Sequence, residues 1–211
     1  MNRPPSGARA AEMSKQTLAY YETSPDSFWE ATKDHDVSQN ISSLLAAIPG
    51  PGPHTILDLG CGPGRDLSAF TALGHRPTGL DGCSRFCDMA RSHSGCEVWN
   101  QDFLSLELPS EEFDGIFANA SLFHIPSPEL PRVLAELRDT LRPGGILFAS
   151  NPRGANVEEW STGRYRNLHD LGQWSGFLSE AGFEVVSHYF RPAGHPREEQ
   201  PWLATVSRRL D

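Results

Sequence analysis

The residues of this chain best suited to chemistry are a carboxylate and three glycines that follow a short apolar run. Asp58 lies two positions before Gly60, and Gly62 and Gly64 follow at alternate positions after the β-prone run 55–59. A strand that ends in a glycine turn and leads into a helix brings bare backbone close to a ligand. We therefore expect a small-molecule site at the end of this strand.

The spacing of these residues indicates which ligand they suit. A dinucleotide site has the pattern Gly-x-Gly-x-x-Gly, but Arg65 and Leu67 occupy the third-glycine position in the two registers of this chain. Asp58 would place negative charge near a pyrophosphate, whereas it suits a ligand with an ammonium or sulfonium group. The turn, including Cys61, is therefore expected to bind S-adenosylmethionine (SAM).

Further polar and aromatic residues follow the next three predicted strands. Asp81 follows the second strand, Gln101, Asp102 and Phe103 follow the third, and Asn119 follows the fourth. In an open α/β sheet, ligands bind beyond the carboxyl ends of the strands, so these residues are expected to converge. Asp81 could accept the ribose hydroxyls, while Asp102 could accept the adenine amino group with Phe103 against the ring.

Strands and helices are predicted to alternate over most of the chain. Helical patterns are expected at 14–23, from Ser24, from Asp36, at 66–73, from Ser84, at 128–141 and at 170–181. Strands are expected at 55–59, 76–80, 96–100, 114–118, 146–150, 184–190 and 202–207. This order predicts an α/β fold, Rossmann-like, with a seven-stranded and mostly parallel sheet, an antiparallel C-terminal hairpin and helices on both faces.

Composition narrows the class of partner. The 211 residues carry a formal net charge of −9, which argues against a nucleic acid or an anionic membrane surface as partner. No apolar run approaches the ~20 residues of a membrane helix, and the four cysteines lack zinc-site spacing. We expect a cytoplasmic protein with reduced thiols, a disordered tail over 1–13 and a single domain over 14–211.

The pattern Asp-x-Gly-x-Gly-x-Gly resembles motif I of class I SAM-dependent methyltransferases. Other segments resemble one subgroup, the methyltransferase domain of ovothiol-biosynthesis enzymes. These segments are Phe28–Thr32, His35–Asn40, Ser121–Pro126, Asn151–Gly154, Arg191–Gly194 and Gln200–Ala204. The resemblance implies methylation of an imidazole nitrogen of 5-thiohistidine. In the ovothiol enzymes the domain follows an iron-dependent sulfoxide synthase, which this chain is too short to contain, so a separate synthase is an expected partner.

Methyl transfer requires the acceptor to be held in line with the donor, and positioning of this kind contributes ~7–11 kcal/mol. An imidazole nitrogen is largely unprotonated at neutral pH, so only a mild base is needed, and His124 is the candidate. Arg153 is expected to hold a substrate carboxylate. The N-terminal helices and the segment 151–169 are expected to form the lid and the substrate pocket. Their candidate ligand-contacting residues are Tyr21, Trp29, Tyr165 and Arg166.

Four other functions are weighed against this pattern. A class I methyltransferase could act on another small amine, thiol or carboxylate. An NAD-type oxidoreductase is disfavoured by the missing third glycine, and a non-catalytic partner subunit by the retained acids and glycines. Protein or tRNA methylation is disfavoured by the acidic balance.

Overall fold

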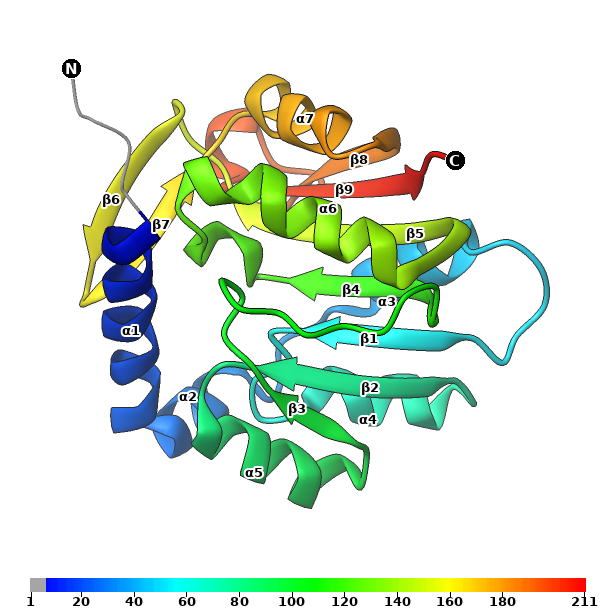
Figure 1. Cartoon of the computed structure of the whole chain (residues 1–211), viewed down its shortest axis with the longest axis horizontal. Helices are drawn as coiled ribbons and strands as arrows, with labels where there is room; N and C mark the ends of the chain where they lie inside the picture. Colours follow the sequence, from blue (N-terminus) through cyan, green and yellow to red (C-terminus); the bar gives the residue numbers. More distant parts are fainter. Residues whose placement is uncertain (1–6) are drawn as a thin grey trace.

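A seven-stranded sheet with the strand order β3-β2-β1-β4-β5-β9-β8 forms the centre of the molecule (Figure 1). The structure is a computed structural model that describes residues 7–211. The strands of this sheet are β1 (Thr55–Leu59), β2 (Arg76–Asp81), β3 (Val98–Asn100), β4 (Phe113–Asn119), β5 (Leu141–Pro152), β8 (Phe183–Arg191) and β9 (Trp202–Arg209). The first five are parallel to one another, and β9 is antiparallel to both β5 and β8.

Helices cover both faces of this sheet. The helices are α1 (Gly7–Thr23), α2 (Pro25–Thr32), α3 (Ser38–Ala47), α4 (Arg65–Ala72), α5 (Ser84–Ser94), α6 (Leu130–Thr140) and α7 (Leu171–Glu180). Short 3-10 turns lie at Leu122–His124, Ser127–Glu129 and Arg197–Glu199. The helices α6 and α7 pack on one face, whereas α3, α4 and α5 pack on the other. The predicted fold class, including the antiparallel C-terminal hairpin, is therefore confirmed.

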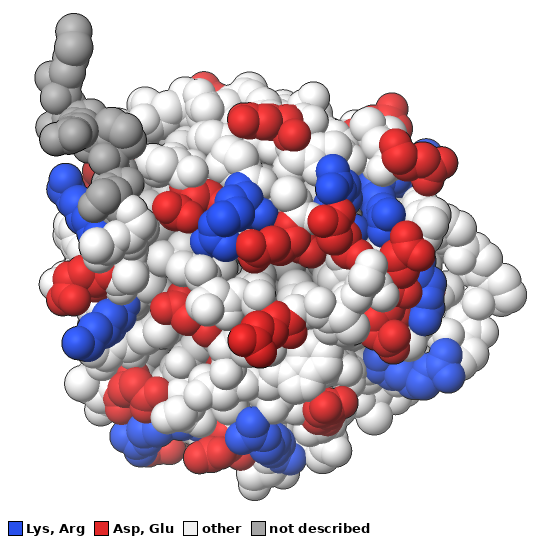
Figure 2. Space-filling view, viewed as in Figure 1, with Lys and Arg blue, Asp and Glu red and all other residues white. Residues whose placement is uncertain are grey.

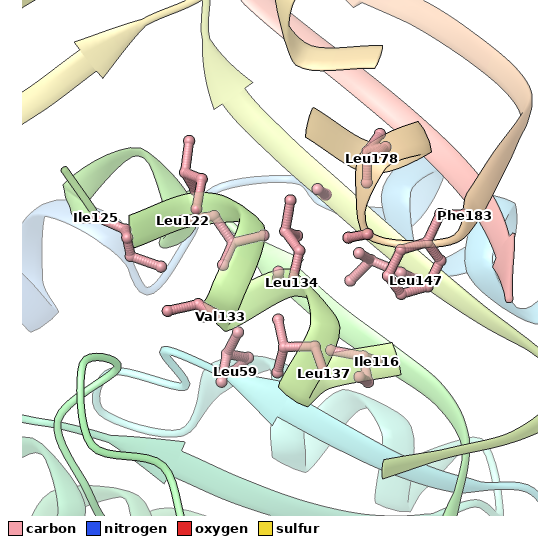
Figure 3. Close-up of a cluster of buried hydrophobic side chains, with 14 of the residues drawn as sticks. Leu59, Ile116, Leu122, Ile125, Val133, Leu134, Leu137, Leu147, Leu178 and Phe183 are labelled. Atoms are coloured by element: carbon pink, nitrogen blue, oxygen red, sulfur yellow. The ribbon is translucent and has the colours of Figure 1, made fainter. Parts of the chain in front are cut away.

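The core forms because the inner strands are apolar on both faces, as expected of a covered parallel sheet. On the α6 side, Leu59 and Ile116 of the sheet meet Leu134 and Leu137 of α6, and all four side chains are fully buried (Figure 3). Burial of one such leucine contributes about 1.5–3 kcal/mol. This packing fixes the sheet against the helices, so the strand ends form a rigid base for a site.

Two further elements lie beyond the carboxyl ends of the parallel strands. The helix α1 lies across these ends and packs on β7 (Arg164–Leu168) (Figure 1). The strand β7 pairs with β6 (Val157–Ser161) in a separate two-stranded sheet. The turn between β6 and β7 consists of Thr162 and Gly163. Their φ angles are 51° and 82°, the positive values of a two-residue hairpin turn.

Two sequence-based expectations need correction. The segment 151–169 contains the hairpin β6–β7, whereas no strand is predicted there. The helix α1 begins at Gly7, so the prediction of a disordered tail is wrong for residues 7–13. The rest of the predicted tail, residues 1–6, lies outside the described residues. The side chain of Ala10 is buried, which explains why this part of the chain is helical rather than a solvated tail.

The surface shown in Figure 2 carries Lys and Arg interleaved with Asp and Glu rather than a patch of one sign. Among residues 7–211, no helix has both the length and the apolar character that a bilayer-crossing segment requires.

Candidate active site

The turn after β1 is shaped by close packing around its glycines. Gly60 has φ of 77°, and a Cβ atom there would lie 2.4 Å from Cβ of Ser121. The amides of Gly60 and Cys61 both donate to the carbonyl of Leu80, at 2.7 and 3.1 Å. Any side chain at position 60 would therefore clash with the residues after β4, and glycine is required.

Gly64 has a different function from the first two glycines of the turn. Its φ is 94°, and a Cβ atom there would lie 2.8 Å from Cα of Ala90 in α5. Gly64 is therefore a site of close approach between the start of α4 and the backbone of α5.

Asp81, at the end of β2, connects the turn to α5. One carboxylate oxygen accepts the Gly62 amide at 2.9 Å, and the other accepts the Cys83 amide at 2.8 Å. Burial raises the pKa of Asp81 to about 6, although the backbone hydrogen bonds oppose this shift. The carboxylate faces the cavity described below with both oxygens partly engaged.

Asp102, after β3, is held by α1. Its carboxylate accepts the hydroxyl of Ser14 at 2.8 and 2.9 Å and the amide of Leu104 at 2.9 Å. Close to this contact, Leu18 of α1 covers Gly82, where a Cβ atom would lie only 2.7 Å from Leu18 Cδ2. The helix α1 therefore closes the site over the ends of β2 and β3.

Asp58 is fully buried beside a second carboxylate, Asp66. Its Oδ2 atom has no hydrogen-bond partner among the described residues. Burial, followed by the charge of Asp66, raises the pKa of Asp58 well above its usual range. The Asp66 carboxylate is instead stabilised by Arg65, which donates to its two oxygens at 2.7 and 2.9 Å. The unpartnered Asp58 oxygen is suited to a hydrogen-donating group.

His124 has a single tautomer because one of its neighbours can only accept. The carbonyl of Tyr165 lies 2.7 Å from Nδ1, so Nδ1 carries the proton. Nε2 is therefore the acceptor and receives the hydroxyl of Tyr21 at 2.8 Å. Arg164 donates to the same hydroxyl oxygen at 3.2 Å. Burial lowers the pKa of His124 to about 4, so the ring is a neutral base at physiological pH.

Most of these groups line one cavity at the carboxyl ends of the parallel strands. Ten of the residues predicted from the sequence lie on its wall: Tyr21, Trp29, Gly60, Cys61, Gly62, Asp81, Asp102, Phe103, Asn119 and His124. Trp29 is additionally stacked on His93, with ring centroids 4.5 Å apart. The convergence of strand ends that the sequence predicts therefore occurs in the structure.

Five predicted residues do not lie on the cavity wall, and Asp58 is one of them because it lies buried next to the cavity. Gln101 turns away, since its amide bonds both the N–H and the carbonyl of Glu107. The ring of Tyr165 is buried, so only its backbone contacts His124. Arg166 pairs with Glu159 in the hairpin, at 2.7 Å.

Arg153 is also placed away from this cavity. Its guanidinium donates to the carbonyls of Gln200 and Arg197, and it lies over the ring of Phe190. It lines a separate, shallow pocket with Phe190 and Arg197. Arg153 therefore lies outside the main cavity, with its Nε and Nη2 atoms bound to these carbonyls, and its contact with a substrate carboxylate stays a prediction.

The sequence reasoning missed a group of wall residues on α1, at and after the end of α2, at the start of α4 and after β4. They include Ser14, Thr17, Leu18, Thr32, His35, Arg65, Asp66 and Ser121. A signal exists for α1, because Ser14, Leu18 and Tyr21 are spaced to lie on one helical face.

Comparison with known proteins agrees with this arrangement. A family model described as a methyltransferase domain matches residues 56–145. A trans-aconitate 2-methyltransferase of Azoarcus sp. (strain BH72) is 31% identical over 80% of this chain and 67% of its own length. A 24-methylenesterol C-methyltransferase 2 of Oryza sativa subsp. japonica is 34% identical over 57% of this chain and 33% of its own. The chain thus spans between a third and two thirds of these relatives.

Among solved structures, the chain is similar to a 1,6-didemethyltoxoflavin-N1-methyltransferase of Burkholderia thailandensis, with a TM-score of 0.76 and 21% identity. The similarity covers 100% of this chain and 94% of that one, and at this identity it shows a shared fold. The trans-aconitate relative establishes the family in sequence, and the fold agrees with it. The chain belongs to the class I SAM-dependent methyltransferases.

Proposed function

We propose that this chain binds SAM in the cavity at the strand ends and transfers its methyl group to a nitrogen of a small heteroaromatic acceptor. The carboxylate of Asp81 would hold the ribose hydroxyls, and Asp102 with Phe103 would hold the adenine. The glycine turn would lie along the rest of the donor. The carboxylates of Asp66, Asp81 and Asp102 on the cavity wall support this assignment, because they suit a donor that carries a cationic group.

Within this proposal, His124 and Tyr21 form the acid–base part of the site. SAM supplies a methyl group activated by a positively charged sulfur. His124 is neutral and accepts at Nε2 from Tyr21, so the pair can take up a proton released by the acceptor as its new N–C bond forms. The proton passes to the Tyr21 oxygen while the Tyr21 proton moves to Nε2. The helix α1 excludes water from this step.

The imidazole of 5-thiohistidine is the first candidate acceptor. The similarity of the segments Phe28–Thr32, His35–Asn40 and Ser121–Pro126 to ovothiol enzymes supports it, and a separate sulfoxide synthase would supply the substrate. The solved structure of similar fold is named an N1-methyltransferase, and methylation at a nitrogen agrees with the same acceptor class. The single observation that carries the proposal is the neutral His124 with its Nε2 directed at Tyr21 on the cavity wall.

A second candidate is a carboxylate acceptor, favoured by the 31% identity to a trans-aconitate 2-methyltransferase. A carboxylate is already deprotonated at neutral pH and needs no base. The dependence of turnover on His124 therefore discriminates between the two acceptor classes.

The direct test is mass spectrometry of reactions of the purified protein with SAM and one acceptor at a time. The acceptors are 5-thiohistidine, histidine and trans-aconitate. A gain of one methyl group on thiohistidine supports the proposal. A gain on trans-aconitate alone would replace it with the second candidate. No gain on any acceptor, with S-adenosylhomocysteine (SAH) binding shown by calorimetry, would remove both named substrates and retain the donor assignment.

A further inference from the structure

A chain of hydrogen bonds joins the outer edge of the sheet to the cavity wall. Arg191, at the end of β8, donates from Nη1 to Oδ1 of Asn40 at 2.9 Å. Asn40 donates from Nδ2 to Oδ1 of Asn119 at 3.0 Å, and Asn119 donates from Nδ2 to Asp66 at 3.3 Å. Asn40 is only 1% exposed, so water does not compete for these bonds. We call these residues the Arg191–Asp66 relay.

The direction of the relay is fixed by its two ends. A guanidinium can only donate, so the Asn40 atom that faces Arg191 must be the oxygen. A carboxylate can only accept, so the Asn119 atom that faces Asp66 must be the nitrogen. The two amides between them then have one compatible orientation. The relay joins segments that lie far apart in sequence and that carry the family resemblance, His35–Asn40 and Arg191–Gly194.

This orientation determines what the β4 end of the cavity offers to a ligand. Asn119 lines the cavity, and one of its two Nδ2 hydrogens remains after the bond to Asp66. Ser121, on the same wall, is 4% exposed and its hydroxyl has no partner among the described residues. The guanidinium of Arg65 is already bound to Asp66 and to the carbonyl of Thr32. Three of its five N–H groups are thus engaged, whereas the Asn119 amide and the Ser121 hydroxyl are neutral donors that remain for an anionic group.

We propose that Arg191 and Asn40 are positioning residues that hold the Asn119 amide with its N–H toward the cavity, where it binds the carboxylate of the methyl donor together with Ser121. This inference rests on the proposed function, because it takes the donor to be SAM. It adds two residues outside the cavity wall to the determinants of donor binding. It also gives a physical role to His35–Asn40 and Arg191–Gly194, two of the segments that carry the family resemblance.

The substitution Asn40→Asp tests the inference because it keeps the side-chain volume and reverses the relay. The new carboxylate can accept from Arg191 but cannot donate to Asn119, so the Asn119 amide must flip and turn its oxygen to Asp66 and the cavity. A hydrogen bond to a charged group is worth about 1.5–3 kcal/mol, so SAH should bind at least about tenfold more weakly. Decarboxylated SAH, S-adenosyl-3-thiopropylamine, should lose less than threefold.

Two further variants separate this role from a general structural effect. Gln39→Glu adds the same charge at the neighbouring, exposed position of α3, outside the relay, and should leave both affinities unchanged. Asn119→Ala should weaken SAH as Asn40→Asp does, and the double variant should be no weaker than Asn119→Ala alone, because Asn40 acts only through Asn119. Calorimetric affinities provide the measurement, with thermal unfolding of each variant as the check on folding.

The outcomes are distinct. Equal losses for SAH and its decarboxylated analogue, or additive losses in the double variant, would overturn the relay and leave the proposed function standing. An unchanged SAH affinity in Asn40→Asp would overturn the relay in the same way. Failure of the unsubstituted protein to bind SAH would overturn the proposed function, and the inference with it.

Discussion

Burial lowers the pKa of His124 and raises the pKa of Asp81, and both shifts favour the neutral form of the side chain. The His124 ring is kept neutral, with a pKa of about 4, because a buried imidazolium would be poorly solvated. Asp81 is kept partly protonated, with a pKa of about 6, because a buried carboxylate is disfavoured in the same way. The proposed hydroxyl acceptor, Asp81, therefore loses its charge as the pH falls below about 6, whereas the proposed base, His124, stays neutral until about pH 4.

The substitution His124→Phe should lower kcat by about 10²–10⁴-fold and leave the affinity for SAH unchanged, because it removes a base but no donor contact. Single-turnover kinetics with calorimetry provides the measurement. Equal turnover in the variant would rule out the base and would favour the carboxylate acceptor.

The same substitution should alter the pH dependence of stability. Between pH 6.5 and 4, the unfolded chain binds a proton at His124 that the folded chain does not, so the contribution of His124 is lost as pH falls through this range. The difference in unfolding free energy between the unsubstituted protein and His124→Phe should shrink by about 3 kcal/mol from pH 7 to pH 4. Urea denaturation across this range measures it, and a constant difference would contradict the assigned pKa.

Donor binding should weaken below pH 6 because of Asp81. Its ionised form can accept both ribose hydroxyls, whereas the protonated form loses an acceptor, and the folded-state pKa is about 6. The dissociation constant of SAH should rise by up to about tenfold per pH unit below 6. The Asp81→Asn variant should bind more weakly but with a flat profile from pH 5 to 7. A sloping profile in that variant would assign the titration to another group.

The cavity residues could be predicted where the sequence places them directly after a strand, as with Asp81, Asp102 and Asn119. The strand ends of a parallel sheet meet at one edge, so their order alone locates them. Arg153 also lies at the end of a strand, but the return of the chain at Gln200 brings carbonyls that bind its Nε and Nη2 atoms outside the main cavity. Such contacts between distant segments leave no local pattern, and for this reason the Arg191–Asp66 relay could not be found from sequence.

At the scale of elements, α1 functions as a cover because three successive turns of one face each contact a strand end. Ser14 binds Asp102, Leu18 covers Gly82, and Tyr21 binds His124. At its last turn, Glu22 accepts the amide and hydroxyl of Ser84 at 2.6 and 3.0 Å. Its carboxylate thus caps the first turn of α5, where negative charge is favoured.

Removing this cap should loosen α1 without disturbing the sheet. A lost cap costs about 0.5–2 kcal/mol, so Glu22→Ala should raise amide hydrogen exchange in α1 by roughly 2–30-fold. Glu12→Ala provides a matched control, because among residues 7–211 the Glu12 side chain is hydrogen-bonded only to Gln16 of the same helix. Exchange in β1 and β4 should stay unchanged in both variants. If Glu12→Ala loosened α1 as much as Glu22→Ala, the effect would be one of helix propensity rather than capping.

The contact between α4 and α5 should depend on Gly64. In Gly64→Ala, the strain of a positive φ adds to the overlap with Cα of Ala90, so we expect a loss of about 2–5 kcal/mol. Gly95 also has a positive φ, 70°, but has open space around it, and Gly95→Ala should lose only about 1–2 kcal/mol. Chemical denaturation compares the two, and equal losses would show that the close approach at Gly64 relaxes freely.

Whole-element predictions succeeded where hydrophobic alternation and glycine or proline signals agreed, and β1, β4 and α7 are examples. They failed for the hairpin β6–β7, whose turn contains Thr162 rather than the usual Asn or Asp before glycine. They also failed for the start of α1, whose first turn lacks an acidic residue. Both elements are stabilised mainly by packing on each other, through contacts such as the bond from the Tyr165 amide to Thr17.

At the scale of the whole molecule, the net charge of −9 and the carboxylates of the cavity wall both favour a positively charged ligand. The positive sulfonium of SAM should be attracted, whereas SAH lacks that charge. Salt screens charges beyond ~10 Å at 0.1 M, so raising the salt concentration from 10 to 500 mM should weaken SAM by roughly 2–5-fold more than SAH. Calorimetric titration of both ligands at each salt concentration measures this ratio. An unchanged ratio would show that only contacts within the desolvated cavity distinguish the two ligands, and that the acidic surface has no part in donor binding.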